Sequence, residues 1–307
     1  MNKISANSNN TLFIIPGKGF SHEGVASEGY KSIRPYVEPN ILFRIFREIC
    51  FRCKFLPHKI WFNKVIKERP YSYIIVHDPL ITREFLDWVK SNQPHAQLNY
   101  IYTNMVGKSR HLFPDEIPDS WRIWTYDDHD GECYGLRVFH ENAYFKSFVK
   151  QRGDVEYDVL FVGRDKGRGE YLLQLEKRLN ELNLKTKFII TADGRLSRRK
   201  AYYQKEISYK DLINLIVKSR AILNISMPNQ KGITMRDLES IFLGVKLITT
   251  NKNIINTDIY NPDNVYIIND SNIDDLPDFL NKEYVPTPQE TLMNHSFSHF
   301  LDIITSE

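Results

Sequence analysis

The sequence has few cysteines, little net charge and no long hydrophobic segment. Three cysteines in 307 residues are an odd number and too few for a disulfide framework, which fits a reducing cytosol. Lys and Arg number 41 against 38 Asp and Glu, so the net charge of +3 gives no general attraction to nucleic acid. No stretch approaches the roughly 20 apolar residues of a membrane span, and the first ten residues are polar. We therefore expect a cytoplasmic chain with neither a signal peptide nor a transmembrane helix.

Two of the cysteines, Cys50 and Cys53, have the Cys-x-x-Cys spacing of half a zinc site or of a redox pair. No second pair follows them, and no predicted strand precedes them. We therefore interpret them as two thiols on a helix.

The chain contains enough apolar residues for two hydrophobic cores. Its length predicts about two domains, and 42% of its residues are hydrophobic. Short β-branched or aromatic runs alternate with amphipathic stretches, which is typical of parallel βαβ layering. The predicted strands are Thr11–Ile15, Tyr73–Val76, Leu98–Tyr102 and Arg122–Tyr126, then Asp158–Val162, Thr186–Thr191, Ala221–Ile225, Lys246–Thr249 and Val265–Ile268. The predicted fold class is α/β, with two Rossmann-like, doubly wound domains.

The predicted domain boundary lies near Val155. The segment Phe145–Tyr157 has no strong apolar period and contains Gly153, so it can serve as a linker. We expect an N-terminal domain at 1–154 and a C-terminal domain at 155–307 that includes a last helix, Gln289–Thr305. Two such domains usually bind a ligand in the cleft between them.

The sharpest local motif is Phe161–Gly169, where a predicted strand ends and a helix begins. A glycine-rich turn with cations can hold a diphosphate through backbone N–H groups and positive charge. The spacing matches neither the G-x-G-x-x-G fingerprint nor the Walker loop, which disfavours a nicotinamide site. The alternative is an ordinary solvated turn. The residues predicted to hold the diphosphate here are Gly163, Arg164, Lys166, Gly167 and Arg168.

A second motif runs from Met227 to Thr249. A polar loop follows a strand that ends at Ile225, and a helix that begins near Thr234 or Met235 points its positive end into that loop.

This second motif resembles the donor-binding signature of glycosyltransferases with the GT-B fold, in which a Gly-rich turn and a helix carrying L-E-A precede a strand. Leu238, Glu239, Gly244 and Ile248 fall in register, as does Gly232, whereas the first glutamate of the family's pair falls at Lys231. The resemblance implies that Glu239 hydrogen-bonds the nucleotide ribose and that the turn holds the diphosphate. The donor-binding residues it implies are Gln230, Gly232, Ile233, Thr234, Met235, Arg236 and Glu239.

Three blocks also resemble bacterial capsule, O-antigen and lipopolysaccharide glycosyltransferases: Phe161–Arg168, Gly232–Glu239 and Lys246–Asn251. The resemblance spans roughly residues 120 to 305. It implies two Rossmann-like domains facing a cleft, an acceptor domain at 1–154 and a nucleotide-sugar donor domain at 155–307. It also implies a hexosyl- or related glycosyltransferase that moves a sugar from a nucleoside-diphosphate sugar to a lipid-linked surface polysaccharide or lipopolysaccharide, at the inner face of a bacterial plasma membrane. In GT-B enzymes the region that corresponds to Tyr209 contacts the nucleobase, so the resemblance implies that Tyr209 contacts the base of the donor. The alternative is that the Tyr209 ring covers the edge of the core.

An inverting enzyme needs a general base, whereas a retaining one does not. Ligands bind at the carboxyl ends of parallel strands, so the candidates follow the predicted strands of the first domain. They are His22, Glu23, His77, Asp78, Asp127, Asp128 and Asp130. We favour Asp127, Asp128 and His22 as catalytic residues. The alternatives are a helix cap for the two aspartates and a solvated loop histidine.

We expect no cofactor and no essential metal. Three aspartates within four residues, Asp127, Asp128 and Asp130, could suggest Mg²⁺, but GT-B enzymes typically lack a D-x-D metal site.

The segment 41–69 is basic and aromatic. Such a segment can lie on an anionic membrane surface, which suits a lipid-linked acceptor. The alternative is that the aromatic residues form the core face of two amphipathic helices. No nucleic-acid motif accompanies them. The basic residues are Arg44, Arg47, Arg52, Lys54, Lys59, Lys64, Lys67 and Arg69, and the aromatic ones are Phe43, Phe46, Phe51, Phe55, Trp61 and Phe62.

Two other functions stay open. One is a non-catalytic protein of the same pathway that binds nucleotide sugars or assembles a complex. The other is a Rossmann-type oxidoreductase or epimerase, which needs a fingerprint that neither first-strand loop supplies.

Overall fold

The computed structural model describes residues 5–17, 19–38, 40–53, 57–107, 112–139, 144–194, 200–227 and 230–306, and of Phe20 and Arg52 it describes the backbone only. Lys54 and Phe55 of the basic segment lie outside these residues. The chain divides into two compact units. The first consists of Met1–Ser147 and Phe297–Glu307, and the second of Phe148–Ser296.

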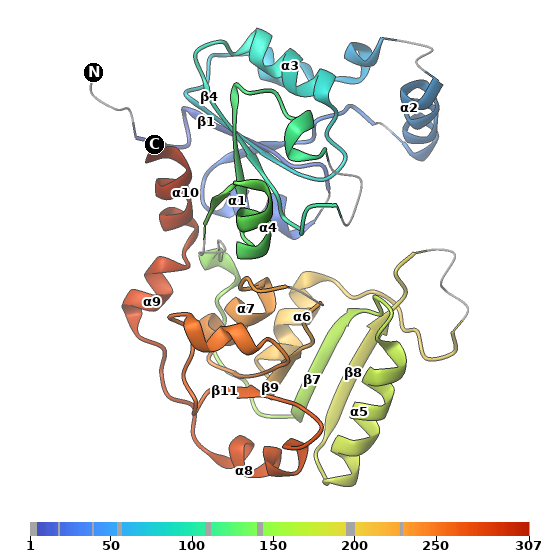
Figure 1. The fold of residues 1–307 in the computed structure, drawn as a ribbon, viewed down its shortest axis with the longest axis vertical. Coiled ribbons are helices and arrows are strands. Elements are labelled where there is room, and N and C mark those ends of the chain that lie inside the picture. The colour runs from blue at the N-terminus through green and yellow to red at the C-terminus, as the bar shows by residue number, and fades with distance from the viewer. Residues whose placement is uncertain are drawn as a thin grey trace. The chain divides into compact units, whose positions relative to one another are not determined.

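Among the described residues, the first unit forms a six-stranded sheet in the order β2-β1-β3-β4-β5-β6, and its strand pairs are parallel (Figure 1). The strands are β1 (Thr11–Ile14), β2 (Lys31–Ile33), β3 (Tyr73–His77), β4 (Gln97–Ile101), β5 (Trp121–Thr125) and β6 (Arg137–Val138). The four strands predicted for this half are confirmed. The two additional strands, β2 and β6, are short edge strands without an apolar run, so hydrophobic periodicity does not reveal them.

The first unit has a core of aliphatic and aromatic side chains, to which α2 (Ile41–Cys53) and α3 (Arg83–Asn92) contribute. Its other helices are α1 (Phe20–Ser27), α4 (Asp128–Tyr134) and α10 (Phe297–Ser306), with the 3-10 helices η1 (His58–Trp61), η2 (Lys64–Lys67) and η3 (Pro114–Glu116), while η4 (Lys146–Phe148) spans the boundary between the units. Cys50 and Cys53 lie on α2 with free thiols, as predicted.

The second unit forms, within its described residues, a five-stranded parallel sheet in the order β11-β10-β9-β7-β8. Its strands are β7 (Tyr157–Arg164), β8 (Thr186–Thr191), β9 (Ser219–Asn224), β10 (Lys246–Thr249) and β11 (Val265–Ile267). All five were predicted, because each is a buried apolar run between helical segments. The fold class, α/β with two doubly wound parallel-sheet domains, is confirmed.

The second unit also contains several helices. In Figure 1, α5 runs alongside β7 and β8. The helices are α5 (Gly169–Glu181), α6 (Tyr209–Ile216), α7 (Met235–Leu243), α8 (Leu276–Asn281) and α9 (Gln289–Asn294), with η6 (Lys252–Asn256) and η7 (Ile273–Asp275). Of the helices in the described ranges, none is long and apolar enough to cross a membrane.

The C-terminal segment differs from the predicted domain assignment. The expected helix Gln289–Thr305 is two helices, α9 and α10, and α10 belongs to the first unit. Phe297 packs there against Phe13, Tyr30 and Phe145 at centroid distances of 5.5, 5.4 and 5.3 Å. The chain therefore passes from the first unit to the second between residues 147 and 148 instead of near Val155, and back to the first between residues 296 and 297. The second crossing occurs because the aromatic side chains of α10 are buried against those of the first unit.

Candidate functional site

The strand order of the second sheet creates a topological switch point. β7 lies between β8 and β9, so the connections that leave β7 and β9 diverge at the carboxyl end of the sheet. Ligands of open α/β sheets bind at such points. Both sequence motifs lie here, since the turn 164–169 follows β7 and the loop 225–234 follows β9.

The turn after β7 is tight. Lys166 and Gly167 have φ values of 49° and 81°, and the Arg168 amide donates to the Asp165 carbonyl at 2.9 Å. Glycine adopts this left-handed backbone conformation more readily than any other residue type, which explains the glycine at position 167. The Lys166 amide donates to the Asp193 carboxylate at 2.9 and 3.0 Å. Several amides that we expected to face a diphosphate are therefore already bound within the protein.

Asp165 anchors this turn. Its side chain is 1% exposed, and it accepts hydrogen bonds from Tyr202 at 2.8 Å, Tyr203 at 2.5 Å and the Gly169 amide at 2.6 Å. Burial alone would raise the pKa of Asp165, but these bonds and Lys200 hold it well below its usual range. A Cβ on Gly169 would lie 2.2 Å from the Tyr202 hydroxyl oxygen, so only glycine fits beside this cluster. The sequence analysis did not select Asp165, although it lies inside the first motif.

Two arginines meet at the switch point. Arg168 donates to the Ile225 carbonyl, beyond β9, and Arg236 donates to the Val162 carbonyl of β7 at 3.0 Å. Burial lowers the pKa of the Arg168 guanidinium, Asp193 and Asp165 oppose that shift, and the neighbouring charge of Arg236 adds to it. The Arg168 Nε is buried and has no hydrogen-bond partner among the described residues. Two adjacent cations with an unused buried donor form a place where an anion is stabilised.

The start of α7 adds donors beside these arginines. Thr234 is the N-cap, and its amide donates to Asp237 Oδ2 at 2.8 Å in a capping box. Asn224, at the end of β9, donates to Asp237 Oδ1 at 2.7 Å and so fixes the helix to the sheet. Within the described part of the chain, the amides of Met235 and Arg236 have no hydrogen-bond partner. The N-terminus of α7 therefore keeps free N–H groups at its positive end.

Glu239 lies one turn further along α7 and is only 2% exposed. Its carboxylate pairs with Arg236 on the same helix. Burial raises the pKa of Glu239, whereas Arg236 and the nearby Tyr209 hydroxyl pull it down. Tyr209 also packs its ring against Phe148, with 4.8 Å between ring centroids. The structure thus brings Tyr209 close to Glu239.

The other predicted donor residues differ in accessibility. Arg164 is more than half exposed and lies 3.6 Å from Glu206. Gln230 accepts a hydrogen bond from the Met227 amide at 3.2 Å, whereas Gly232 and Ile233 are buried. Gly163 lies in β7, and its carbonyl accepts from Thr191 at 3.4 Å. These residues shape the loops around the arginines.

The first sheet has its own switch point between β1 and β3. His22 lies there after β1, and His77 ends β3. The His22 Nε2 lies 3.2 Å from the Ile15 carbonyl and 3.0 Å from the Gly17 carbonyl, so this nitrogen carries the proton. Its Nδ1 then accepts from the Ser32 hydroxyl at 2.8 Å. Both ring nitrogens of His22 are therefore engaged.

The carboxylates predicted after β5 have structural partners. Asp127 is fully buried and is the N-cap of α4, where it accepts from the His129 amide at 3.0 Å. Asp130 is 2% exposed and accepts from the Val106 amide at 2.8 Å. Asp128 is the first residue of α4 and is partly exposed. Among the described residues no group of three or more His, Cys, Asp or Glu is placed to hold a metal ion.

His77 gives the first unit a pH dependence. Burial and the charge of His22 lower its pKa to about 4, against the opposing effect of Asp78. Because the folded pKa lies below that of the unfolded chain, about 6.5, the contribution to stability is present above that pH and is lost as pH falls. We expect the free energy of unfolding to fall by about 3 kcal/mol between these two pKa values.

This expectation is checked by urea unfolding of wild type and His77→Gln across that pH range. The variant should have a flatter profile, while His95→Gln, which changes an exposed histidine of the same unit, should keep the wild-type slope. Equal slopes in wild type and His77→Gln would refute the assignment.

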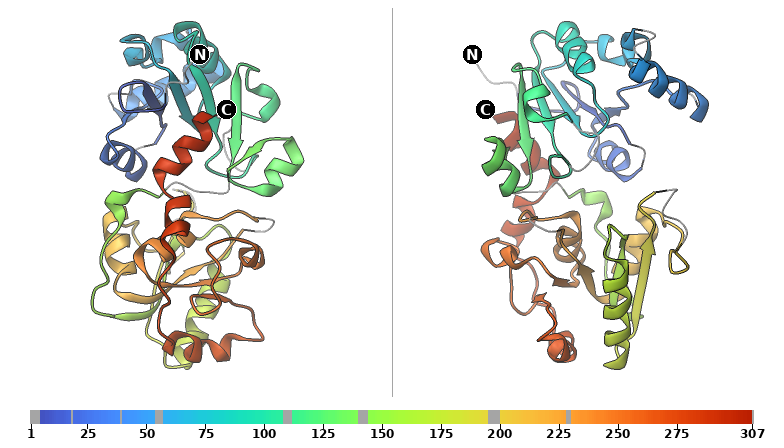
Figure 2. Two further views of the ribbon diagram at one scale, coloured as in Figure 1. Left: turned by 90° about the vertical axis from the view of Figure 1, so that its left-hand side faces the viewer. Right: turned by 45° about the vertical axis from the view of Figure 1, so that its right-hand side comes forward.

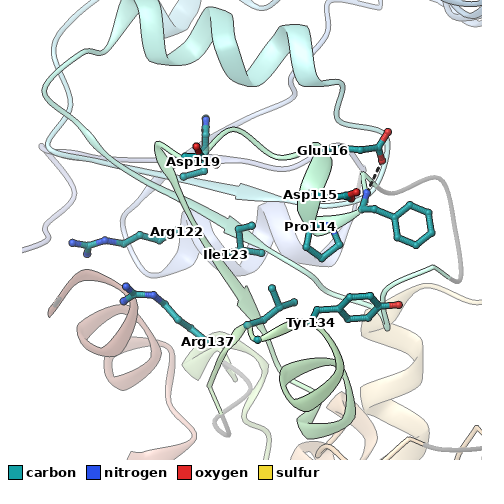
Figure 3. A pocket seen from close by; sticks show the side chains of 12 residues that line it. Pro114, Asp115, Glu116, Asp119, Arg122, Ile123, Tyr134 and Arg137 are labelled. Carbon is teal, nitrogen blue, oxygen red and sulfur yellow. Dashed lines mark hydrogen bonds between the residues drawn. The ribbon is translucent and has the colours of Figure 1, made fainter.

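A pocket of about 940 Å³ lies elsewhere in the first unit, along η3, β5, the end of α4 and β6 (Figure 3). It presents Asp115 and Asp119 as well as Arg122 and Arg137, and Figure 3 shows the two arginine side chains extending in the same direction. Burial and the charge of Arg137 lower the pKa of Arg122. None of the three predicted catalytic residues lines this pocket.

No protein-family model matches the chain, and no curated protein matches it. Similar solved structures include a glycosyltransferase from Rickettsia africae, with 12% identity, a TM-score of 0.48, and coverage of 96% of this chain and 98% of that one. Another is a DNA-modifying β-glucosyltransferase whose substrate is uridine diphosphoglucose, with 11% identity, a TM-score of 0.43, and coverage of 97% and 95%.

A third similar structure is a protein from Listeria monocytogenes assigned as a UDP-N-acetylglucosamine 2-epimerase. It has 11% identity and a TM-score of 0.43, and the match covers 93% of this chain and 90% of that one. A function for this chain has to be argued from its own residues.

Proposed function

We propose that this protein is a glycosyltransferase that uses a nucleoside-diphosphate sugar as its donor. The observation that carries the proposal is the pair Arg168 and Arg236 at the switch point of the second sheet, with a buried unused donor on Arg168. The free amides at the start of α7 add to the same positive region. The motif resemblance supports the same reading, because it selects these two segments.

The chemistry of sugar transfer suits such a region. When the bond between the sugar and the diphosphate breaks, negative charge develops on the departing phosphate. Preorganised cations and N–H groups stabilise that charge more strongly in the transition state than in the ground state. We propose that Arg168, Arg236 and the N-terminus of α7 supply this stabilisation. Lys166 and Arg164 add positive charge at the rim.

We propose that the base and ribose lie toward Tyr209 and Glu239. The resemblance implies a direct hydrogen bond from Glu239 to the ribose. The burial of Glu239 and its pairing favour a second role, in which this carboxylate holds Arg236 and Tyr209 in place. Inorganic pyrophosphate has no ribose, so it separates these two roles.

We propose that the acceptor is a surface polysaccharide or a lipid-linked glycan, used at the cytoplasmic face of a bacterial membrane without an essential metal or cofactor. Acceptor activation would fall to the carboxyl edge of the first sheet. His22 and Asp128 are partly exposed there, whereas Asp127 is buried and holds the start of α4. The acceptor class comes from the motif resemblance.

A calorimetric titration tests the donor site. UDP, GDP, CMP and dTDP, each beside its common sugar conjugates, are titrated into the whole chain. We expect one diphosphate to bind, and Arg168→Gln to weaken it at least about tenfold because a charge-assisted contact is lost. Lys177→Gln, on the exposed face of α5, is the matched control. The absence of binding by any nucleotide would overturn the proposed donor site.

A non-catalytic nucleotide-sugar-binding protein is the second candidate. Two predicted catalytic groups already have partners within the protein, which favours this candidate. Asp127 caps α4, and both ring nitrogens of His22 form hydrogen bonds. This candidate predicts donor binding with no sugar release or transfer, whereas a transferase also hydrolyses or transfers the bound sugar.

A further inference from the structure

Helix α2 presents its apolar side to solvent. Leu42, Ile45, Phe46 and Ile49 have the i, i+3, i+4, i+7 spacing of one helix face. In a water-soluble domain this face normally packs on the core. Here the four residues are 71%, 51%, 47% and 51% exposed. Figure 2 shows α2, in dark blue, at the periphery of the first unit.

The opposite side of α2 explains this orientation. Arg47 faces the protein, is 3% exposed, and pairs with Glu38 and with Glu48 at 2.7 Å. Its guanidinium also lies over the Tyr36 ring, 4.4 Å from the centroid. Turning the helix to bury its apolar face would break this buried ion pair and expose Cys50. The exposed apolar face is therefore held by specific contacts.

The apolar surface continues beyond the helix. Phe43 and Phe46 pack edge-on against Trp61 of η1, at 6.3 and 5.8 Å between centroids. Ile60, next to Trp61, is 53% exposed. Of the predicted aromatic set, Trp61 and Phe62 belong to the core and Phe51 packs against it, while Phe43 and Phe46 are exposed. We call α2 together with η1 and the adjoining Lys64 the apolar-basic surface.

Charge complements the apolar residues. Arg44, Lys59 and Lys64 are exposed, and none of them has an ion-pair partner in the described part of the chain. Of the nearby acidic residues, Glu38 and Glu48 pair with Arg47, Glu68 pairs with Lys31, and Glu84 lies 3.6 Å from His58. Asp87 and Glu84 line the same hollow as Lys59, whereas Arg44 and Lys64 do not line it. The surface therefore combines bulky apolar side chains with exposed cations.

We propose that the apolar-basic surface binds the surface of an anionic lipid bilayer, with α2 lying in the plane of the interface. Exposed aliphatic and aromatic side chains insert at the boundary between headgroups and acyl chains, and flanking cations contact anionic headgroups. A second copy of this chain is a poorer occupant, because two such surfaces repel each other through their cations. The proposal does not depend on the donor site of the second unit.

Sedimentation with lipid vesicles tests the proposal, using the whole chain without nucleotide. We expect binding to vesicles of equal parts phosphatidylcholine and phosphatidylglycerol, weaker binding to pure phosphatidylcholine, and loss of binding at high salt. The variant Arg44→Gln/Lys59→Gln/Lys64→Gln should bind about a hundredfold more weakly at low salt. The control Lys177→Gln/Lys205→Gln/Lys210→Gln removes three exposed cations of the second unit and should bind like wild type.

The apolar face is tested separately. Leu42→Asn/Ile45→Asn/Ile49→Asn should lower the partition coefficient at least about tenfold without changing the fold, since each of these residues is at least half exposed. Ile255→Asn/Val285→Asn/Met293→Asn changes exposed apolar residues of the second unit, which are 52%, 40% and 61% exposed, and should have no effect.

A dye reports which segment enters the interface. Cys53 at the end of α2 and Cys133 on α4 are exposed, whereas Cys50 is buried. An environment-sensitive dye on Cys53 in the Cys133→Ser variant should shift to shorter wavelength with anionic vesicles, and a dye on Cys133 in Cys53→Ser should not. The proposal would be overturned if all variants bound anionic vesicles equally, or if wild type bound neutral and anionic vesicles equally. A dimer of the wild-type chain that only the apolar variant disrupts would also overturn it.

Discussion

Replacing Arg236 with alanine is expected to destabilise the second unit by about 3 kcal/mol and to remove most of the affinity for a nucleoside diphosphate. The first effect follows from Glu239, which is 2% exposed and loses its cationic partner. The second follows from the loss of one of the two guanidinium groups at the switch point. Urea unfolding followed by circular dichroism measures the stability, and calorimetry measures the affinity.

The double variant Arg236→Ala/Glu239→Gln separates these effects. Removing the buried charge of Glu239 should restore most of the lost stability, because no unpaired carboxylate remains. The nucleotide affinity should stay low, since the guanidinium is still missing. If the double variant is as unstable as Arg236→Ala, the charge of Glu239 is not the cause of the instability.

The single variant Glu239→Gln distinguishes a ribose contact from an indirect role. A direct contact predicts weaker binding of the nucleoside diphosphate with unchanged binding of inorganic pyrophosphate. A role through Arg236 predicts that both become weaker, because both ligands need the guanidinium in place.

Replacing Asp165 with alanine is the second change with a large expected effect, a loss of about 3 kcal/mol of stability. The substitution leaves the hydroxyls of Tyr202 and Tyr203 and the Gly169 amide without their buried acceptor. Because the pKa of Asp165 is held low in the folded state, its contribution is present above about pH 4 and is lost as pH falls below that value. The variant should therefore lose less stability than wild type on acidification below that pH.

Two further variants check the Asp165 cluster. Gly169→Ala should destabilise the same turn, since its Cβ would collide with the Tyr202 hydroxyl. Asp278→Asn changes an exposed carboxylate on α8 and should leave both stability and pH profile unchanged. The chain's tryptophans, at 61, 88, 121 and 124, all lie in the first unit, so their fluorescence serves as an internal reference. An Asp165→Ala variant as stable as wild type would show that the cluster does not hold the turn.

The strands with an apolar run were predictable, whereas those without one were not. Thr186–Thr191 and Lys246–Thr249 have the predicted bounds, because each is a short buried run between helical segments. β2 and β6 form by pairing with β1 and β5 at the sheet edges. A segment of two or three residues that gains its order from a neighbouring strand has too little periodicity of its own.

The candidate site was predictable in position but not in its internal bonds. The motif after β7 and the motif before α7 identify the region. The sequence does not show that the Lys166 amide is taken by Asp193, 27 residues away, or that Arg168 binds the Ile225 carbonyl, 57 residues away. Such contacts depend on which strands become neighbours in the sheet.

The sequence by itself determined that there are two α/β domains, which segments form the proposed donor region, and that the helix at 41–53 has an amphipathic spacing. These properties are local, since they follow from residue type and from periods of two and 3.6 residues. Only the tertiary structure decided that α10 joins the first unit, that Glu239 is buried with Arg236, and that the apolar face of α2 points to solvent. The first depends on contacts between residues distant in the chain, such as Phe13 with Phe297, and the other two depend on how α7 and α2 pack in their units, through Arg236 on the Val162 carbonyl and Arg47 on the Tyr36 ring.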